Sequence, residues 1–376
     1  MNVVFVCLTL GGGGAERVIQ TLSNKLISLG VKVTIIALED SNVAYGYSKD
    51  IKIIELKTAK LMKGVGKLFY IPLQAIELNR VLKTISNCSV MSFLVRANFT
   101  FIISSFFSKR KVIISERNHS QSQYKRKGVK GFIFRYLISK LYNMADIIVP
   151  ISMGIEDSLR NDFNIRNPTF KTIYNPQDIK SIRSVKIRND LVNNEYFNYI
   201  TAGRLIEQKD HMTLLKSFSK VIKNAPKSRL YILGDGPLRG QLESYIKVNE
   251  LEGYVFLLGF KQNAFEYFKQ CDCFVFSSIF EGFGNVLVEA MACGLPIVST
   301  SCPSGPSEIL GDGQYGLLSD IYDVDALSHN MLIIQSDGCQ SKFSELSKIR
   351  CEHFDIDLIS SQYFEVLRVS LDREAA

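Results

Sequence analysis

The fold of this chain is decided by the stretch Phe280-Glu-Gly-Phe-Gly-Asn-Val-Leu-Val-Glu-Ala-Met-Ala-Cys-Gly-Leu-Pro-Ile-Val-Ser-Thr300. A polar loop broken by glycines follows the apolar run 273–276 and becomes a short apolar helix, which ends at Gly294-Leu-Pro296 before a second apolar run. Strand, loop, helix and strand form one unit of a parallel sheet, and ligands bind at the loop end of such units. Glu281 in the loop and Glu289 in the helix are therefore candidate ligands for two sets of hydroxyl groups, as on a nucleotide sugar. The alternative is that both acids are simply solvated.

Short apolar runs alternate with helical segments along both halves of the 376 residues. In the first half we expect a helix over 15–29 and strands at 3–8, 33–37, 51–56, 90–93, 112–115 and 147–149. In the second half we expect helices over 210–223 and 238–249, and strands at 198–202, 229–233, 255–258, 273–276 and 297–300. This alternation predicts an α/β protein with two helix-covered parallel sheets, and the polar stretch 176–197 is the expected boundary between them.

A glycine-rich loop joins the first strand to the first helix in Thr9-Leu-Gly-Gly-Gly-Gly-Ala-Glu-Arg17. Its glycines let a ligand approach the backbone and offer N–H groups to an anion beside a helix N-terminus, which makes Gly13 and Gly14 candidate binding residues. A dinucleotide site is disfavoured, because Glu16 breaks the spacing of the glycine fingerprint and no acid ends the second strand in register. An ion pair between Glu16 and Arg17 on the helix surface is an equally good interpretation of those two residues.

Three further loops follow strands of the second half. The first, Gly203-Arg-Leu-Ile-Glu-Gln-Lys209, supplies two cations, Arg204 and Lys209, between a strand and a helix. Fixed cations stabilise the negative charge that gathers on a diphosphate leaving group. Gly234 and Gly259 follow the next two strands, and together the loops form a row of open strand ends where a nucleotide can lie.

Charge is unevenly divided along the chain. Residues 1–180 hold 26 Lys and Arg against 12 Asp and Glu, whereas residues 181–376 carry a net charge of −6 within a total of +8. The basic half favours an anionic partner, and the chain lacks the motifs of nucleic-acid-binding proteins, so we expect an anionic membrane surface and no nucleic acid. Basic residues gather in the segment 124–136 and in a stripe formed by Lys57, Lys60, Lys63 and Lys67, although both could be solvated faces.

Composition argues for a cytoplasmic protein without a metal site. No apolar run reaches the length of a membrane span, and the first residues do not form a signal peptide. The closely spaced Cys271 and Cys273 have no second Cys/His pair nearby. Two Asp-x-Asp triplets, at 323–325 and 355–357, lie in late, helix-rich sequence and are interpreted as helix caps or solvated acids. We therefore expect no metal and no other cofactor.

Taken together, these motifs resemble the donor site of family 4 retaining glycosyltransferases, and the resemblance covers nearly the whole chain. It implies the GT-B fold, with two doubly wound, Rossmann-like domains facing a cleft. Residues 1–181 would form the acceptor-side, membrane-facing domain and 182–355 the nucleotide-sugar-binding domain. A helix within 356–376 would cross back to the first domain.

The resemblance also implies roles for the matched residues. Glu289 would hold the ribose hydroxyls, Glu281 would lie near the donor sugar, and Arg204 with Lys209 would stabilise the leaving diphosphate. Gly13 and Gly14 would touch the donor diphosphate, and the remaining contacts to base, sugar and phosphate would come from Gly234, Gly259, Phe283, Gly284 and Asn285.

The segment Ile114-Ser-Glu-Arg-Asn-His119 departs from the family pattern. Many relatives have a histidine after Ser-Glu that faces the reacting carbon, but here Arg117 occupies that position and His119 comes two residues later. His119 and Glu116 are therefore the candidate catalytic residues of the first domain.

The run Ser301-Cys-Pro-Ser-Gly-Pro-Ser-Glu-Ile-Leu310 is similar to one in bacterial enzymes of O-antigen, capsule and lipid-linked oligosaccharide assembly. The resemblance implies a UDP-sugar donor carrying a hexose or N-acetylhexosamine and a polyprenyl-diphosphate-linked saccharide acceptor at the cytoplasmic face of the inner membrane. Two alternatives keep the fold: a nucleotide-sugar 2-epimerase, and a nucleotide-sugar-binding protein without catalysis.

Overall fold

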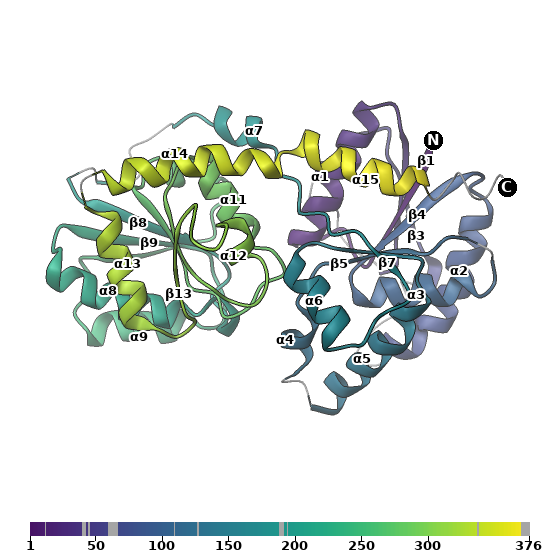
Figure 1. Ribbon diagram of the computed structural model, residues 1–376, viewed down its shortest axis with the longest axis horizontal. Coiled ribbons are helices and arrows are strands. Elements are labelled where there is room, and N and C mark those ends of the chain that lie inside the picture. The colour runs from purple at the N-terminus through teal and green to yellow at the C-terminus, as the bar shows by residue number, and fades with distance from the viewer. Residues whose placement is uncertain are drawn as a thin grey trace. The chain divides into compact units, whose positions relative to one another are not determined.

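The computed structural model describes residues 1–11, 13–39, 43, 46–58, 67–108, 110–125, 128–187, 192–193, 195–336 and 338–369. It divides into two compact units, Met1–Pro176 with Ile356–Ala376, and Gln177–Asp355 (Figure 1). The chain first crosses from unit 1 to unit 2 between residues 176 and 177, whereas the sequence predicted this boundary between 181 and 182. The last helix belongs to unit 1, so unit 2 is inserted into unit 1 along the chain.

Unit 1 contains a parallel sheet with the strand order β3-β2-β1-β4-β5-β6-β7. Its strands are β1 (Asn2–Cys7), β2 (Lys32–Ala37), β3 (Lys52–Glu55), β4 (Cys88–Phe93), β5 (Ile113–Glu116), β6 (Ile147–Pro150) and β7 (Thr169–Phe170). Its helices include α1 (Gly14–Ser28), α2 (Ile71–Lys83), α3 (Val95–Ser105), α4 (Ser120–Lys125), α5 (Gly128–Leu141), α6 (Met153–Asn161) and α15 (Ile356–Val369). The sheet order reverses between β1 and β4.

Unit 2 repeats this plan with the strand order β10-β9-β8-β11-β12-β13. Its strands are β8 (Phe197–Ala202), β9 (Ser228–Leu233), β10 (Val255–Gly259), β11 (Cys273–Phe276), β12 (Ile297–Thr300) and β13 (Leu317–Ser319). Its helices include α7 (Ile179–Ser184), α8 (His211–Asn224), α9 (Arg239–Val248), α10 (Phe265–Phe268), α11 (Asn285–Ala292), α12 (Pro306–Ile309), α13 (Val324–Ile334) and α14 (Cys339–Cys351). The order reverses between β8 and β11, which pair in parallel. Both sheets have the doubly wound, Rossmann-like arrangement that the sequence predicts.

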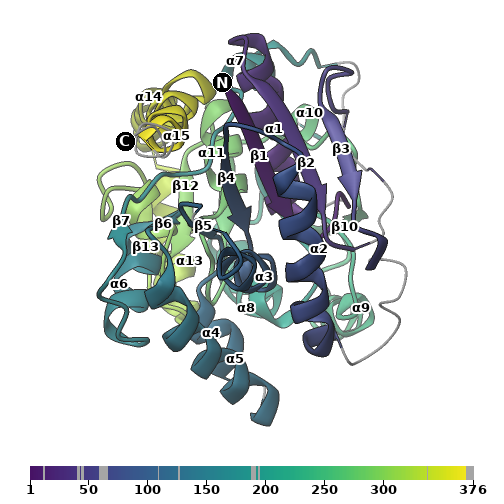
Figure 2. The same ribbon diagram turned by 90° about the vertical axis from the view of Figure 1, so that its right-hand side faces the viewer.

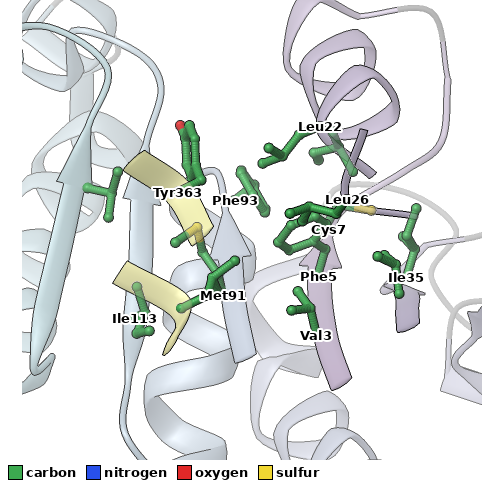
Figure 3. Close-up of a cluster of buried hydrophobic side chains, with 14 of the residues drawn as sticks. Val3, Phe5, Cys7, Leu22, Leu26, Ile35, Met91, Phe93, Ile113 and Tyr363 are labelled. Carbon is green, nitrogen blue, oxygen red and sulfur yellow. The ribbon is translucent and has the colours of Figure 1, made fainter. Parts of the chain in front are cut away.

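The core of unit 1 needs the last helix of the chain. The inner strands carry buried apolar side chains such as Phe5 and Phe93, whose rings meet edge to face at 5.2 Å. Tyr363 of α15 lies in the same cluster (Figure 3), and its side chain is fully buried. Lys25 of α1 and Asp357 of α15 form an ion pair beside this contact. Residues 356–369 are therefore part of the packed core of unit 1.

Two short strands, β7 and β13, were not predicted from the sequence. They extend the two sheets at β6 and β12 and contain two and three residues. Runs this short do not establish a period in the sequence. In the described residues, no helix is long and apolar enough to cross a bilayer.

Candidate functional site

The candidate donor site of unit 2 lies where the strand order reverses, at the carboxyl ends of β8 and β11. Lys209 ends a short 3₁₀ turn, Glu207–Lys209, that follows β8, and Glu281 follows β11. Such switch points are where doubly wound sheets bind ligands, because the adjoining loops diverge there. The two residues that the sequence placed in different loops are thus neighbours.

Lys209 and Glu281 form an ion pair with 2.5 Å between Nζ and Oε1. The Lys209 side chain is 19% exposed and that of Glu281 is 10% exposed, so the pair is largely shielded from water. The Lys209 ammonium group also lies 5.2 Å from the centre of the Phe276 ring. The cation at the switch point is thus paired with a carboxylate of the same chain.

Hydrogen bonds to backbone carbonyl groups hold the two loops together. The N–H of Ile279 donates to the carbonyl oxygen of Gln208 at 2.9 Å, and the side-chain amide of Gln208 donates to the carbonyl of Phe280 at 2.9 Å. The Ser277 hydroxyl donates to the carbonyl of Lys209 at 2.8 Å. These bonds fix the backbone on both sides of the ion pair.

Glycines let the strand ends of unit 2 come close together. The N–H of Gly234 donates to the carbonyl of Gly259 at 2.8 Å, and Gly234 has a φ of +130°. A side chain at this position would overlap the carbonyl oxygen of Gly203. Gly259 also has a positive φ, +72°. Arg204 is exposed beside this row of glycines.

The loop before α11 is held in part by Ser304 and Gly305, which were not among the predicted site residues. Gly284 precedes α11 with a φ of +100°, and no side chain caps the helix at that residue. Gly305 has a φ of +92°, and a side chain there would overlap the carbonyl oxygen of Phe283. The Ser304 hydroxyl donates to the carbonyl of Glu281. The Ser-Gly-Pro sequence at 304–306 could have indicated this turn, because glycine is favoured where φ is positive.

The side chains expected to surround the donor lie in different environments. Phe283 is buried, and its ring meets that of Phe354 at 5.4 Å. Asn285 is the first residue of α11, and Glu289 is a buried residue of its second turn. Glu281 and Glu289 are thus both supplied by one loop and the helix that follows it.

In unit 1 the carboxyl end of β5 contains a buried hydrogen-bond network around Glu116. The Tyr142 hydroxyl donates to Glu116 Oε2 at 2.5 Å, and the N–H groups of Arg117 and Asn118 donate to Oε1, both at 3.2 Å. The amide of Asn98 donates to the Tyr142 oxygen at 2.9 Å. Burial raises the pKa of Glu116 to about 7. Glu116 is fully buried, so its carboxyl group holds the start of the following loop.

Arg117, which stands where relatives often have histidine, is also buried. Its guanidinium group donates to Asn175 Oδ1 at 2.5 Å and to the Tyr363 hydroxyl at 3.4 Å, and it lies 5.5 Å from the centre of the Phe93 ring. These contacts make Arg117 a structural residue that joins β5 to α15.

His119 follows in the same loop and is partly buried. Its Nδ1 atom lies 2.9 Å from the Ser122 hydroxyl and accepts the Ser122 N–H at 3.2 Å. Burial lowers the pKa of His119, which favours the neutral imidazole. Of the two first-domain candidates, His119 is the one with exposed surface.

The glycine-rich loop leads directly into α1. Gly13 caps α1 and Gly14 is its first residue, and both are exposed. The Thr9 hydroxyl donates to Glu16 Oε1 at 2.9 Å, and a side chain at Gly13 would overlap the Glu16 carboxylate. The absence of a side chain at Gly13 therefore leaves room for Glu16 beside the start of α1.

An ion pair that no sequence motif indicated lies at the switch point of unit 1. Arg96 in the first turn of α3 pairs with Glu39, which follows β2, and burial lowers the pKa of Arg96. Both residues are common surface types in sequence, so only the fold reveals that they meet.

Of the acids in the Asp-x-Asp triplets, Asp323 caps a helix as expected, two others form ion pairs, and Asp355 is buried rather than solvated. Asp323 caps α13 by accepting the N–H of Ala326 at 2.9 Å, and Asp325 pairs with Lys220. Asp357 pairs with Lys25. Across the described residues, no cluster of three or more His, Cys, Asp or Glu side chains is placed to hold a metal ion.

Comparison with known proteins identifies the class. Residues 12–181 match the family model Glycosyltransferase Family 4, and residues 184–348 match Glycosyl transferases group 1. The structure of Anabaena HepE in complex with UDP aligns with a TM-score of 0.79 and 20% identity, covering 98% of this chain and 100% of that one. The fold is therefore GT-B, and the chain belongs to the glycosyltransferases, one family model matching each half.

Two similar proteins come from Campylobacter jejuni. N-acetylgalactosamine-N,N'-diacetylbacillosaminyl-diphospho-undecaprenol 4-alpha-N-acetylgalactosaminyltransferase is 29% identical over 350 residues, which are 92% of this chain and 94% of that protein. GalNAc-alpha-(1->4)-GalNAc-alpha-(1->3)-diNAcBac-PP-undecaprenol alpha-1,4-N-acetyl-D-galactosaminyltransferase is 26% identical over 372 residues, 98% of each chain. Similar chains thus include transferases whose names specify undecaprenol-linked saccharides.

Proposed function

We propose that this chain transfers a hexose or N-acetylhexosamine, such as N-acetylgalactosamine, from a UDP-sugar to a polyprenyl-diphosphate-linked saccharide, with retention of configuration. The observation that carries the proposal is the Lys209–Glu281 pair at the switch point of the second sheet, which joins a cation for phosphate to a carboxylate for sugar hydroxyls. The acceptor class is supported by the names of the two Campylobacter jejuni relatives. Such products are precursors of surface polysaccharides, including O-antigen and capsule.

The proposed mechanism needs no metal. As the bond between the sugar and the UDP β-phosphate breaks, negative charge grows on the diphosphate, and Arg204 and Lys209 stabilise it. A β-phosphate oxygen accepts the proton of the attacking acceptor hydroxyl, so the products are UDP and the lengthened saccharide. Glu281 orients the donor sugar and Glu289 binds the ribose. The N–H groups near Gly13 and Gly14 would contact the donor diphosphate from the first domain.

A donor panel tests this function. The purified chain is incubated with UDP-hexoses and UDP-N-acetylhexosamines, with and without a polyprenyl-diphosphate-linked saccharide, in the presence of EDTA. We expect UDP release that depends on the acceptor and survives EDTA. A free-sugar epimer would instead indicate the epimerase, binding without turnover would indicate a non-catalytic protein, and rescue by Mg²⁺ or Mn²⁺ would contradict the metal-independent mechanism.

A lipid-linked acceptor requires the enzyme to work at a membrane surface. We therefore place the protein on the cytoplasmic face of the inner membrane as a peripheral protein. The support is the acceptor class and the basic first half of the chain, where residues 1–180 carry 26 Lys and Arg against 12 Asp and Glu.

A further inference from the structure

Helix α5 (Gly128–Leu141) has two apolar faces, and unit 1 covers one of them. The covered face carries Phe134 and Ile138, and the Phe134 ring stacks on Tyr124 at 4.7 Å between centres. A surface helix ordinarily presents polar residues on its other side. Helix α5 instead also exposes a row of large apolar residues, which its packing within unit 1 does not explain.

The outer face of α5 displays four large apolar side chains to solvent. Val129 is 78% exposed, Phe132 68%, Ile133 42% and Tyr136 56%. Their spacing of three, four and seven residues places them on one side of the helix. Helices α4 and α5 lie at the lower end of unit 1 in both views (Figures 1 and 2). This row of side chains is called the α5 outer face below.

The sequence of α4, α5 and the residues between them is basic, although Arg126 and Lys127 lie outside the described residues. The segment 120–141, which spans α4 and α5, contains six basic residues and no acidic residue. Among them, Lys130 and Lys140 are exposed on α5 itself. A second copy of the chain is a poor occupant, because a self-complementary contact would bring the basic residues of both copies together.

We propose that the α5 outer face docks unit 1 on an anionic lipid bilayer, a proposal that rests on the lipid-linked acceptor proposed above. Phe132, Tyr136 and their neighbours enter the region between headgroups and acyl chains, while the basic residues remain among anionic headgroups. Each basic residue near such a surface adds about fivefold to binding. The stripe at Lys57, Lys60, Lys63 and Lys67 is not needed for this proposal, and Lys60 and Lys63 lie outside the described residues.

Vesicle sedimentation tests the α5 outer face. The full chain is mixed with vesicles of phosphatidylcholine alone or with phosphatidylglycerol added, and we expect it to sediment only with the second. Phe132→Ser combined with Tyr136→Ser should lower the partition coefficient by about 10- to 100-fold. The control is Leu73→Ser combined with Ile76→Ser on α2, where Leu73 is 53% and Ile76 38% exposed. The proposal would be overturned if the parent protein sedimented equally with and without phosphatidylglycerol. It would also be overturned if only the α2 control variant lost vesicle binding.

A fluorescence reporter tests the same contact without relying on a loss of binding. Because the chain contains no tryptophan, Phe132→Trp introduces a single one. We expect its emission to shift to the blue on phosphatidylglycerol vesicles and to be quenched by brominated lipid, whereas Leu73→Trp shows neither change. Unshifted emission from Phe132→Trp while the protein sediments with vesicles would place the contact elsewhere and contradict the proposal.

Transfer to a water-soluble acceptor analogue separates this inference from the proposed function. The α5 variants should release UDP at the parental rate with such an analogue, because α5 contains none of the candidate donor-site residues. Vesicle binding without transfer would refute the proposed function alone. Transfer with an α5 outer face that does not meet lipid would refute the docking proposal alone.

Discussion

Replacing Glu281 or Glu289 with glutamine should separate two functions of one loop and helix. The amide keeps the size of each side chain but removes its charge. Glu281 pairs with Lys209 at 2.5 Å and is shielded from water. Glu281→Gln therefore breaks this ion pair but keeps the Lys209 ammonium group in the site. Lys209 can then turn fully to the diphosphate. Glu281→Gln should therefore leave UDP affinity within about threefold of the parent, since a hydrogen-bonded carboxylate is lost but a competing partner is removed.

The expected losses follow from the value of a hydrogen bond to a charged group. Losing a contact that forms with the reacting sugar should raise the activation free energy by about 1–3 kcal/mol, which lowers kcat by about 5- to 150-fold in Glu281→Gln. Glu289→Gln should instead weaken UDP binding by about 1–3 kcal/mol, because Glu289 is the proposed ribose ligand. Titration calorimetry with UDP and initial rates of UDP release from the preferred donor measure the two quantities separately.

A matched control is available on the surface of unit 2. Glu345 pairs with Lys348 on α14 with its side chain 69% exposed, so Glu345→Gln should change neither affinity nor rate. Parental transfer by both site variants would show that the donor site is assigned to the wrong residues. Equal weakening of UDP binding in both would refute the division between a sugar ligand and a ribose ligand. Urea unfolding of each variant checks that the changes are local.

Three further results are expected. Arg204→Ala should lower kcat/KM by about 10- to 150-fold by removing a charged contact to the leaving diphosphate, and an unchanged rate would exclude Arg204 from the site. Gly305→Ala should destabilise the protein by about 2–5 kcal/mol in urea unfolding and weaken UDP binding, because its side chain meets the Phe283 carbonyl at a φ of +92°. Gly313→Ala, at a φ of +99° with open space around it, should cost only about 1–2 kcal/mol; equal losses would contradict the steric argument. Burial raises the pKa of Glu116 to about 7 in the folded protein. The contribution of Glu116 to the free energy of unfolding is therefore complete below the pKa that it has in the unfolded chain, and it is lost as pH rises through 7. The parent should therefore lose stability relative to Glu116→Gln between pH 5 and pH 8 in urea unfolding, and parallel curves would contradict the raised pKa.

Most strands of both sheets were predictable because they are buried, whereas the short strands β7 and β13 were not. Runs such as residues 3–7 of β1 and 230–233 of β9 are apolar, since helices cover both faces of a parallel sheet. The loops that follow them were predictable too, because their glycines and cations interrupt the pattern. This is why Lys209 and Glu281 could be selected as site residues although 72 positions separate them in the chain.

What the sequence did not reveal depends on long-range pairing. The contact between Lys209 and Glu281 requires β8 and β11 to be neighbours. The periodicity of apolar residues predicts individual strands, but it does not predict their order in the sheet. The same holds for Arg117, whose partners Asn175 and Tyr363 are distant in the chain. A sequence motif marked Arg117 as an unusual residue, but only its burial against α15 explains its presence.

The position of α15 has a consequence for synthesis on the ribosome. Ile359, Tyr363 and Leu367 complete the core of unit 1, yet they leave the ribosome after all of unit 2. The ends of unit 2 lie together, because Gln177 donates its N–H to the Phe354 carbonyl at 2.9 Å, so that unit can close as soon as it is made. The earlier half must wait about 10–40 s at ordinary elongation rates with its apolar sheet incompletely covered. The part of the protein that is translated first is thus the part that finishes folding last, and nascent chains stalled before residue 356 should depend most on chaperones.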